Sequence, residues 1–175
     1  MIHISYDRRQ YQEDMIENIN LFDNVVEIGC HVGTSTRIIS RLCQDGTVYA
    51  FDNSPESVKP MEQLKNEYQN VEFTLADVRR QEVLTEFSRK CDDIDVVCID
   101  LGGGYHPDTV FKVFFIWSSI LKPRVSLIRN RGLADFINTS TTTEDISSTE
   151  GFLSSSSDNV KIESLDELKL WTRNL

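Results

Sequence analysis

Short apolar runs that are rich in β-branched residues recur along the chain and predict β-strands. Five such runs stand out, at Asn24–Gly29, Thr47–Asp52, Val71–Leu75, Ile94–Asp100 and Val125–Arg129. Apolar residues follow one another in these runs with few polar interruptions, a pattern typical of parallel strands that are covered on both faces. The runs therefore predict a parallel sheet inside the protein.

Segments with helix-like patterns or helix-start signals separate these runs. Thr34–Cys43 and Met61–Tyr68 read as helices, and Asp108 can cap a third helix over Thr109–Leu121. Strand and helix alternate, which predicts an α/β fold with a doubly wound, mostly parallel sheet and right-handed crossovers. The third helix is apolar on nearly every side, so we expect another helix or a second subunit to cover it, and a homodimer stays open.

The two ends of the chain depart from this alternation. Apolar residues at helical spacing within residues 1–22 predict a helical cap against the edge of the sheet. Near the other end, Val160–Ser164 and Leu168–Arg173 read as strands separated by a gap too short for a helical crossover. We therefore expect a C-terminal antiparallel hairpin, which brings the predicted sheet to seven strands.

These segments predict one domain that occupies residues 1–175. After the cap at 1–22, residues 23–138 form the predicted core, and the Ser/Thr-rich residues 139–158 are expected to be a solvated loop with one short helix. Residues 159–175 form the predicted hairpin. A chain of 175 residues fits a single domain of ordinary size.

Charge and composition narrow the choice of partners. Lys and Arg number 18 against 28 Asp and Glu, and the resulting net charge of −10 disfavours a nucleic-acid partner. No apolar stretch approaches the roughly 18 residues of a membrane span, and the polar N-terminus does not resemble a secretory signal, so we expect a cytoplasmic protein without a membrane partner. The four cysteines form no CxxC pair, which favours buried thiols over a metal site.

A glycine turn follows the first of the five predicted strands. Gly29 and Gly33 lie between the strand and the start of a helix, where backbone N–H groups can approach a ligand. Asp52 ends the next strand, 23 residues after Gly29, close to the spacing of the acidic residue that holds the ribose of an adenosine cofactor. The same residues also fit a tight packing turn and a helix cap, so the turn alone leaves both interpretations open.

Four segments taken in order carry a more specific signal. VVEIGCHVGTSTRII, VYAFDNSPESV, VEFTLADVRR and DVVCIDLGGG resemble motifs I to IV of the class I S-adenosylmethionine-dependent methyltransferases. The predicted terminal hairpin is similar to the last two strands of that family, so the resemblance extends over roughly residues 23–173. It implies a Rossmann-like fold and S-adenosylmethionine as the cofactor.

The resemblance also implies a role for each matching residue. Glu27 would lie near the methionine amino group, Asp52 would hold the ribose hydroxyls, and Asp77 would accept from the adenine amino group. The full implied set of cofactor-binding residues is Glu27, Gly29, His31, Gly33, Asp52, Asn53, Asp77, Val78, Asp100 and Leu101. Carboxylates at the ends of adjacent parallel strands suit a ligand with an ammonium, a sulfonium and two vicinal hydroxyls.

The chain departs from the family pattern at three places. His31 replaces the middle glycine of the G-x-G-x-G turn, and we interpret it as a loop residue bonded to backbone rather than a base. The segment after Asp100 lacks the signature of many amino-methylating relatives. Arg129, Asn130 and Arg131 stand where metal-dependent relatives need acidic ligands, so no metal is expected.

Three residues are the candidates for catalysis. Asp100 ends the fourth of the five strands, beside which the transferable methyl group would project, and Tyr105 and His106 follow a flexible triple glycine. His106 also fits a plain turn residue ahead of a helix. The sequence thus predicts a methyltransferase that acts on an unidentified small-molecule or protein acceptor. A non-catalytic S-adenosylmethionine-binding or interaction protein with the same fold is the alternative.

Overall fold

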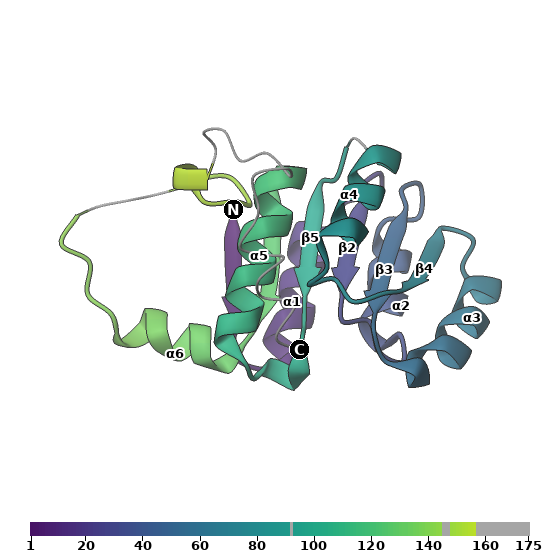
Figure 1. The fold of residues 1–175 in the computed structure, drawn as a ribbon, viewed down its shortest axis with the longest axis horizontal. Helices are drawn as coiled ribbons and strands as arrows, with labels where there is room; N and C mark the ends of the chain where they lie inside the picture. Colours follow the sequence, from purple (N-terminus) through teal and green to yellow (C-terminus); the bar gives the residue numbers. More distant parts are fainter. Residues whose placement is uncertain (92, 145–147, 157–175) are drawn as a thin grey trace.

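A computed structural model of the chain describes residues 1–91, 93–144 and 148–156. Its described strands form one six-stranded sheet in the order β1-β6-β5-β2-β3-β4, in which all neighbouring strands pair in parallel. The strands are β1 (Ile2–Ser5), β2 (Val25–Ile28), β3 (Val48–Asp52), β4 (Val71–Leu75), β5 (Val96–Ile99) and β6 (Val125–Arg129). The parallel α/β architecture expected from the sequence is confirmed (Figure 1).

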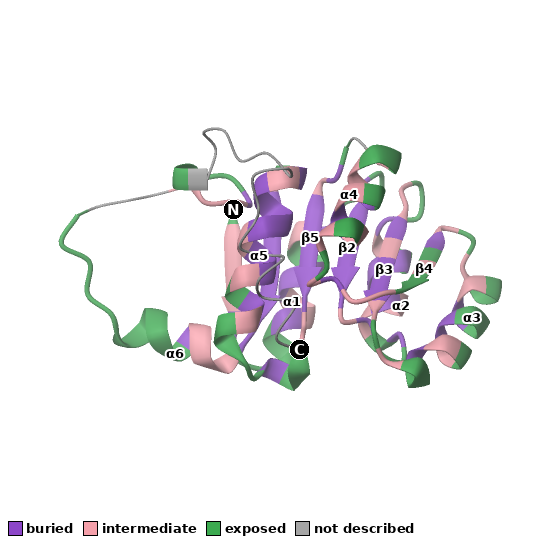
Figure 2. Cartoon of the chain, viewed as in Figure 1, coloured by how far each residue is buried: buried purple, intermediate pink, exposed green. Residues whose placement is uncertain are grey.

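Helices cover both faces of the sheet. They are α1 (Arg8–Asn18), α2 (Thr34–Leu42), α3 (Val58–Glu67), α4 (Gln81–Lys90), α5 (Pro107–Leu121) and α6 (Arg131–Thr139). Buried residues of α1, α2 and α3 share one hydrophobic cluster, and those of α4 and α5 share another, which α6 also contacts. The central strands between the two clusters are buried on both sides (Figure 2), which explains their continuous apolar runs.

The N-terminal segment contains a strand that the sequence pattern did not predict. β1 pairs with β6 from Ile2 opposite Ser126 to Ser5 opposite Arg129. The predicted helix follows as α1, but its buried Tyr11 and Met15 belong to the cluster on one face of the sheet. The cap therefore lies over a face rather than against an edge. The Ser5 hydroxyl donates to the buried carboxylate of Asp14 and joins strand to helix.

The C-terminal part of the chain is only partly described. The predicted hairpin strands Val160–Ser164 and Leu168–Arg173 lie outside the described residues. In the Ser/Thr-rich segment, the described residues include a short 3₁₀ helix at Ser154–Ser156 and a buried Gly151, whose carbonyl accepts from the Ser126 hydroxyl. Part of the segment expected to be a solvated loop is thus anchored on β6.

Helix α5 begins earlier than predicted and is covered within the chain. It starts at Pro107, and His106 rather than Asp108 takes the N-cap position, so Asp108 stands in the first turn. The helix contacts α4, α6 and β5, so it is covered by other helices of the same chain, which is one of the two arrangements expected. Among the described helices, none is long and apolar enough to cross a membrane.

Trp117 of α5 connects this helix to the loop that follows β4. Its side chain is 1% exposed, and its Nε1 donates to the Val78 carbonyl at 2.9 Å. The indole ring also meets the ring of Phe51 edge-on, at 5.2 Å between centroids. These contacts hold the loop after β4 against the core.

We expect Trp117→Phe to lower the free energy of unfolding by about 1–3 kcal/mol, because it leaves the buried Val78 carbonyl without its donor and removes ring volume. Urea denaturation followed by circular dichroism measures this loss. Phe111→Leu is the matched control, since Phe111 lies on the same helix and is 46% exposed. Equal stability of the two variants would contradict the anchoring role of Trp117.

Candidate functional site

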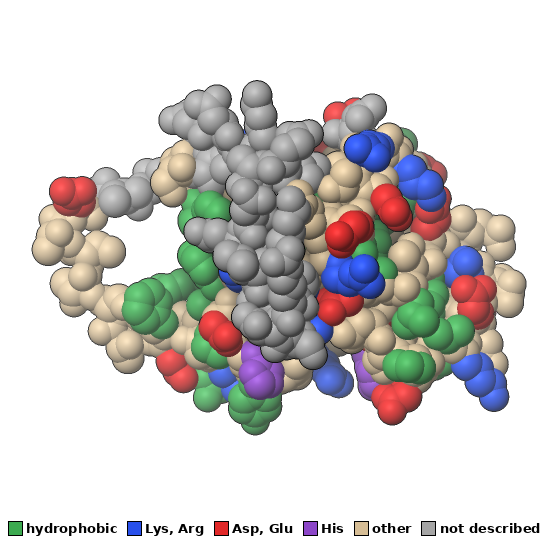
Figure 3. All heavy atoms as spheres, in the orientation of Figure 1, with side chains coloured by type: hydrophobic (Ala, Val, Ile, Leu, Met, Phe, Trp, Pro, Cys, Tyr) green, Lys and Arg blue, Asp and Glu red, His purple; other side chains and the backbone are tan. Residues whose placement is uncertain are grey.

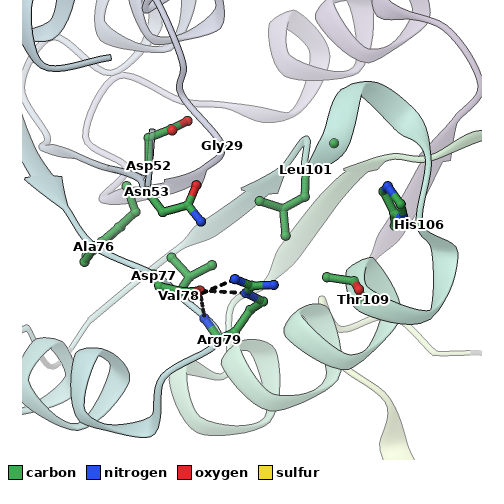
Figure 4. A pocket seen from close by; sticks show the side chains of 12 residues that line it. Gly29, Asp52, Asn53, Ala76, Asp77, Val78, Arg79, Leu101, His106 and Thr109 are labelled. Carbon is green, nitrogen blue, oxygen red and sulfur yellow. Dashed lines mark hydrogen bonds and ion pairs between the residues drawn. The ribbon is translucent and has the colours of Figure 1, made fainter. Parts of the chain in front are cut away.

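A cavity of about 350 Å³ opens at the carboxyl ends of the strands. The chain runs outward from β2 to β3 and β4 on one side and from β5 to β6 on the other, so the strand order reverses between β2 and β5. Open α/β sheets bind ligands at this switch point. Figure 4 shows the cavity and its lining residues Gly29, Phe51, Asp52, Asn53, Ala76, Asp77, Val78, Arg79, Leu101, Gly102, His106 and Thr109.

The glycine turn brings the ends of β2 and β5 together. A Cβ on Gly29 would lie 2.3 Å from the Asp100 carbonyl oxygen, and the residue has a φ of +89°, so only glycine fits. Gly33 precedes α2 with a φ of +78°, and a Cβ there would lie 2.5 Å from Leu64 Cδ1. Both glycines therefore allow close packing, which agrees with the interpretation of this segment as a tight packing turn. Gly29 also lines the cavity.

His31 and Asp52 join the glycine turn to the end of β3. The backbone N–H of His31 donates to Asp52 Oδ2 at 2.8 Å, and that of Ser54 donates to Asp52 Oδ1 at 2.8 Å. His31 has a φ of +47°, in the left-handed region that glycine adopts more easily, and its side chain is exposed. Each Asp52 oxygen keeps a further acceptor position for a ligand hydroxyl.

Glu27 lies buried behind the glycine turn and is 2% exposed. Its Oε2 accepts from the Thr36 hydroxyl at 2.6 Å, and among the described residues no Lys or Arg forms an ion pair with it. Burial raises the pKa of Glu27 to about 7, and the charges of Asp100 and Asp52 act in the same direction. The site thus holds a carboxylate whose negative charge has no positive partner.

Asp77 forms a two-point ion pair with a residue that the sequence analysis missed. Arg79 Nε donates to Asp77 Oδ1 at 2.8 Å and Nη2 donates to Oδ2 at 2.7 Å (Figure 4). Burial would raise the pKa of Asp77, but the hydrogen bonds and charge of Arg79 outweigh it and lower that pKa. The i, i+2 placement of Asp77 and Arg79 was the signal that could have found this pair.

Asp100 is compensated by a buried arginine. Arg129 Nη1 donates to both carboxylate oxygens of Asp100 at 2.9 Å, and Nη2 donates to the Gly103 carbonyl at 3.2 Å. Arg129 is 7% exposed, so its charge is largely shielded from solvent. The pair fixes the carboxylate of Asp100 and steadies the triple glycine, whose three residues all have positive φ.

The other two catalytic candidates take different positions. His106 lines the cavity and occupies the N-cap position of α5, with a φ of +57° and no capping hydrogen bond from its side chain. Tyr105 is 58% exposed and does not line the cavity, and its hydroxyl accepts from Arg131 Nη1 at 3.1 Å. Of the three candidates for catalysis, His106 is therefore the one whose side chain borders the cavity.

The structure brings seven predicted site residues into the cavity lining and leaves five outside it. Those in the lining are Gly29, Asp52, Asn53, Asp77, Val78, Leu101 and His106. Those outside are Glu27, His31, Gly33, Asp100 and Tyr105. Phe51, Ala76, Arg79, Gly102 and Thr109 line the cavity without having been predicted. Within the described residues, His, Cys, Asp and Glu side chains form no cluster of three or more that could hold a metal.

Comparisons with known proteins agree with this geometry. The family described as "Methyltransferase domain" matches residues 26–129. Among solved structures, the chain is similar to fibrillarin in a complex with Nop5p, at 16% identity over 60% of this chain and 48% of that chain, with a TM-score of 0.52. No curated protein sequence matches the chain.

Two further fibrillarins show the same likeness. Aeropyrum pernix fibrillarin, in complex with natively bound S-adenosyl-L-methionine, is 15% identical over 59% of this chain and 42% of that chain, with a TM-score of 0.51. The Methanococcus jannaschii fibrillarin, a pre-rRNA processing protein, is 18% identical over 58% of this chain and 41% of that chain, with a TM-score of 0.50. The alignments thus span less than half of these proteins, and at such identities the likeness is one of fold.

The family match covers more than half of the chain and includes the glycine turn and the ends of β2 to β6. A methyltransferase domain is consistent with S-adenosylmethionine, the cofactor that the sequence motifs imply. The chain belongs to the methyltransferase-domain family.

Proposed function

We propose that the protein is an S-adenosylmethionine-dependent methyltransferase that acts on a small-molecule or protein acceptor. The observation that carries this proposal is the cavity at the switch point, whose lining includes Asp52, Asn53, Asp77 and Val78. Its volume of about 350 Å³ lies within the usual range for small-molecule sites, roughly 300–1,000 Å³. Buried Glu27 without a cationic partner fits a ligand that carries an ammonium group.

The cofactor would be held by residues from four strand ends. Glu27 takes the methionine ammonium, and the turn with Gly29, His31 and Gly33 wraps the methionine. Asp52 accepts from the ribose hydroxyls. The adenine contacts, and those near the sulfonium, come from Asn53, Asp77, Val78, Asp100 and Leu101.

The chain's part in catalysis is to position an acceptor and to accept its proton where it has one. When bound, S-adenosylmethionine supplies a methyl group on a positively charged sulfur. His106 borders the cavity and can accept a proton from an acceptor there. Asp100, held by Arg129, provides negative charge at the end of β5, and Tyr105 directly precedes His106, with its hydroxyl bonded to Arg131.

The charge distribution supports an acceptor other than a nucleic acid. The chain carries a net charge of −10, and in the described part of the face in Figure 3 basic and acidic side chains intermix around α4. The similar fibrillarins include a pre-rRNA processing protein, but that likeness extends to the fold alone. A non-catalytic binding protein remains the alternative, because the Asp100 carboxylate is already engaged by Arg129.

The same proposal includes the arrangement of the whole chain. We infer one domain over residues 1–175, with a C-terminal hairpin at 159–175 that adds to the sheet. Helices α4 and α6 already contact α5, which supports a monomer over a dimer built on that helix.

We expect S-adenosylmethionine and S-adenosylhomocysteine to raise the melting temperature, because a ligand that binds only the native state stabilises it. NAD at the same concentration should leave the melting temperature unchanged. Differential scanning fluorimetry measures all three. Equal shifts, or no shift with any of them, would overturn the proposed function.

We expect Asp52→Ala to weaken S-adenosylhomocysteine binding by about 1–3 kcal/mol, roughly 5- to 150-fold in Kd, because hydrogen bonds to a charged acceptor are lost. Isothermal titration calorimetry provides the Kd. The matched control is Glu56→Ala, which removes an exposed carboxylate near the same strand end. An unchanged Kd in Asp52→Ala would mean that Asp52 serves only to hold the turn.

Glu27→Gln should have opposite effects on stability and on binding. With a pKa of about 7 in the folded protein and 4.5 as its ordinary value, Glu27 destabilises the fold progressively as pH rises from 4.5 to 7. At pH 8 the glutamine variant should therefore be more stable by on the order of 3 kcal/mol, and at pH 4.5 nearly equal. It should bind S-adenosylhomocysteine at least tenfold more weakly.

Urea denaturation at both pH values and calorimetry at pH 8 test these effects. Glu72→Gln, an exposed position on β4, is the control and should change neither quantity. A glutamine variant that is less stable than the parent protein at pH 8 would show that Glu27 is a structural residue.

A further inference from the structure

Arg131 lies among aromatic side chains at the carboxyl end of β6. Its guanidinium carbon is 5.5 Å from the centroid of the Tyr6 ring and 5.4 Å from that of the Tyr105 ring. Its Nη1 donates to the Tyr105 hydroxyl at 3.1 Å. Tyr6 and Tyr105 are 50% and 58% exposed, so this cluster is open to the surface. A guanidinium flanked by aromatic rings is held in place while it stays charged.

The guanidinium of Arg131 has no acidic partner among the described residues. The guanidinium of Arg129, two residues earlier, donates hydrogen bonds to the Asp100 carboxylate and to the Gly103 carbonyl. In the part of the chain that the structure describes, Arg131 forms no ion pair. Its Nε is buried without a hydrogen-bond partner, as is that of Arg129, and its Nη1 donates to the Tyr105 hydroxyl. Nη2 of Arg131 forms no hydrogen bond with the described residues, so it is the donor that a bound acceptor group can meet.

Two helix starts meet beside Arg131. A Cβ on Gly132 would lie 2.8 Å from Pro107 Cγ, so the first turns of α5 and α6 are in close contact. Each helix start carries a partial positive charge of about half an elementary unit. Asn130 caps α6 and donates from Nδ2 to the Tyr105 carbonyl at 2.8 Å, which fixes Tyr105 beside the helix start. Asp108, in the first turn of α5, is exposed to solvent.

The Arg131 cluster adjoins the candidate cofactor cavity. Tyr105 is directly followed by His106, which lines that cavity, and Gly102 of the triple glycine lines it as well. The three glycines have positive φ, and side chains of Arg129 and Asn130 donate to the Gly103 and Tyr105 carbonyls, so the loop holds Tyr105 next to His106. A molecule bound beside His106 therefore lies next to the segment that carries Tyr105, whose hydroxyl accepts from Arg131.

We propose that Arg131, with Tyr6 and Tyr105, binds a carboxylate or phosphate group on a small-molecule methyl acceptor. The inference rests on the proposed function, because it assigns this anion to the acceptor. A guanidinium matches both groups through two parallel N–H donors, and the aromatic rings suit a planar or apolar body next to the anion. The net charge of −10 favours a small anion over a polyanion.

Titration of the ¹⁵N-labelled full chain with inorganic phosphate and with benzoate, at constant ionic strength, tests this site by NMR. We expect a millimolar Kd, with shifts at the amides of Arg131 and Gly132. Arg131→Gln should raise the Kd at least fivefold, and Arg131→Lys should give an intermediate value because it keeps the charge without the paired donors. Arg89→Gln, an exposed arginine on α4, should leave the Kd unchanged.

The variants also separate this inference from the proposed function. A Kd within twofold of the parent value in Arg131→Gln, in a variant whose spectrum shows it folded, overturns the anion site. A 12-nucleotide RNA that binds 100-fold tighter than phosphate and depends on Arg131 overturns the small-molecule assignment. If the anions bind through Arg131 but S-adenosylhomocysteine does not stabilise the same protein, the proposed function fails and with it the assignment of this anion to a methyl acceptor.

Discussion

The ligand cavity depends on one close approach, between the turn after β2 and the backbone after β5. At Gly29 this approach leaves no room for a Cβ, because the Asp100 carbonyl oxygen would lie 2.3 Å from it. The turn then reaches back to β3, since the Gly29 N–H donates to the Phe51 carbonyl at 2.8 Å. With the ends of three neighbouring strands tied in this way, the side chains that follow each strand face one cavity at the point where the strand order reverses.

Three carboxylates lie near that approach, and each has a different kind of hydrogen-bond partner. Arg129 pairs with Asp100, and backbone N–H groups hold Asp52. Among the described residues the Glu27 carboxylate is bonded only to the Thr36 hydroxyl, and burial raises its pKa to about 7. A buried carboxylate with a raised pKa lowers the free energy of unfolding above its ordinary pKa. Such a residue is typical of binding or catalytic sites rather than of the hydrophobic core.

Local patterns predicted the strands β2 to β6 and the helices α2, α3 and α5, but α4 and α6 were not predicted. The expectation that all five strands are covered on both faces was wrong for β4, which lies at the edge of the sheet and is largely exposed. Asp52 and Asp77 were predicted because they stand at or just after the ends of β3 and β4. The strand β1 was missed: four residues with alternating polarity give little signal, and its partner β6 lies more than 120 residues away. The position of the cap over a sheet face was missed for the same reason, since it depends on β1.

The candidate cofactor site and the Arg131 cluster also differ in how far the sequence reveals them. The cofactor site is built from residues at consecutive strand ends, so spacing along the chain reveals it. The Arg131 cluster is built from three distant segments, at Tyr6, at Tyr105 and at the start of α6, and only the fold brings them together. Arg129 and Arg131 look alike in sequence, yet the first ends a buried strand and the second begins the helix that Asn130 caps. Arg129 pairs with Asp100, whereas Arg131 is half-buried between two aromatic rings and has no acidic partner among the described residues, so only the fold distinguishes the two.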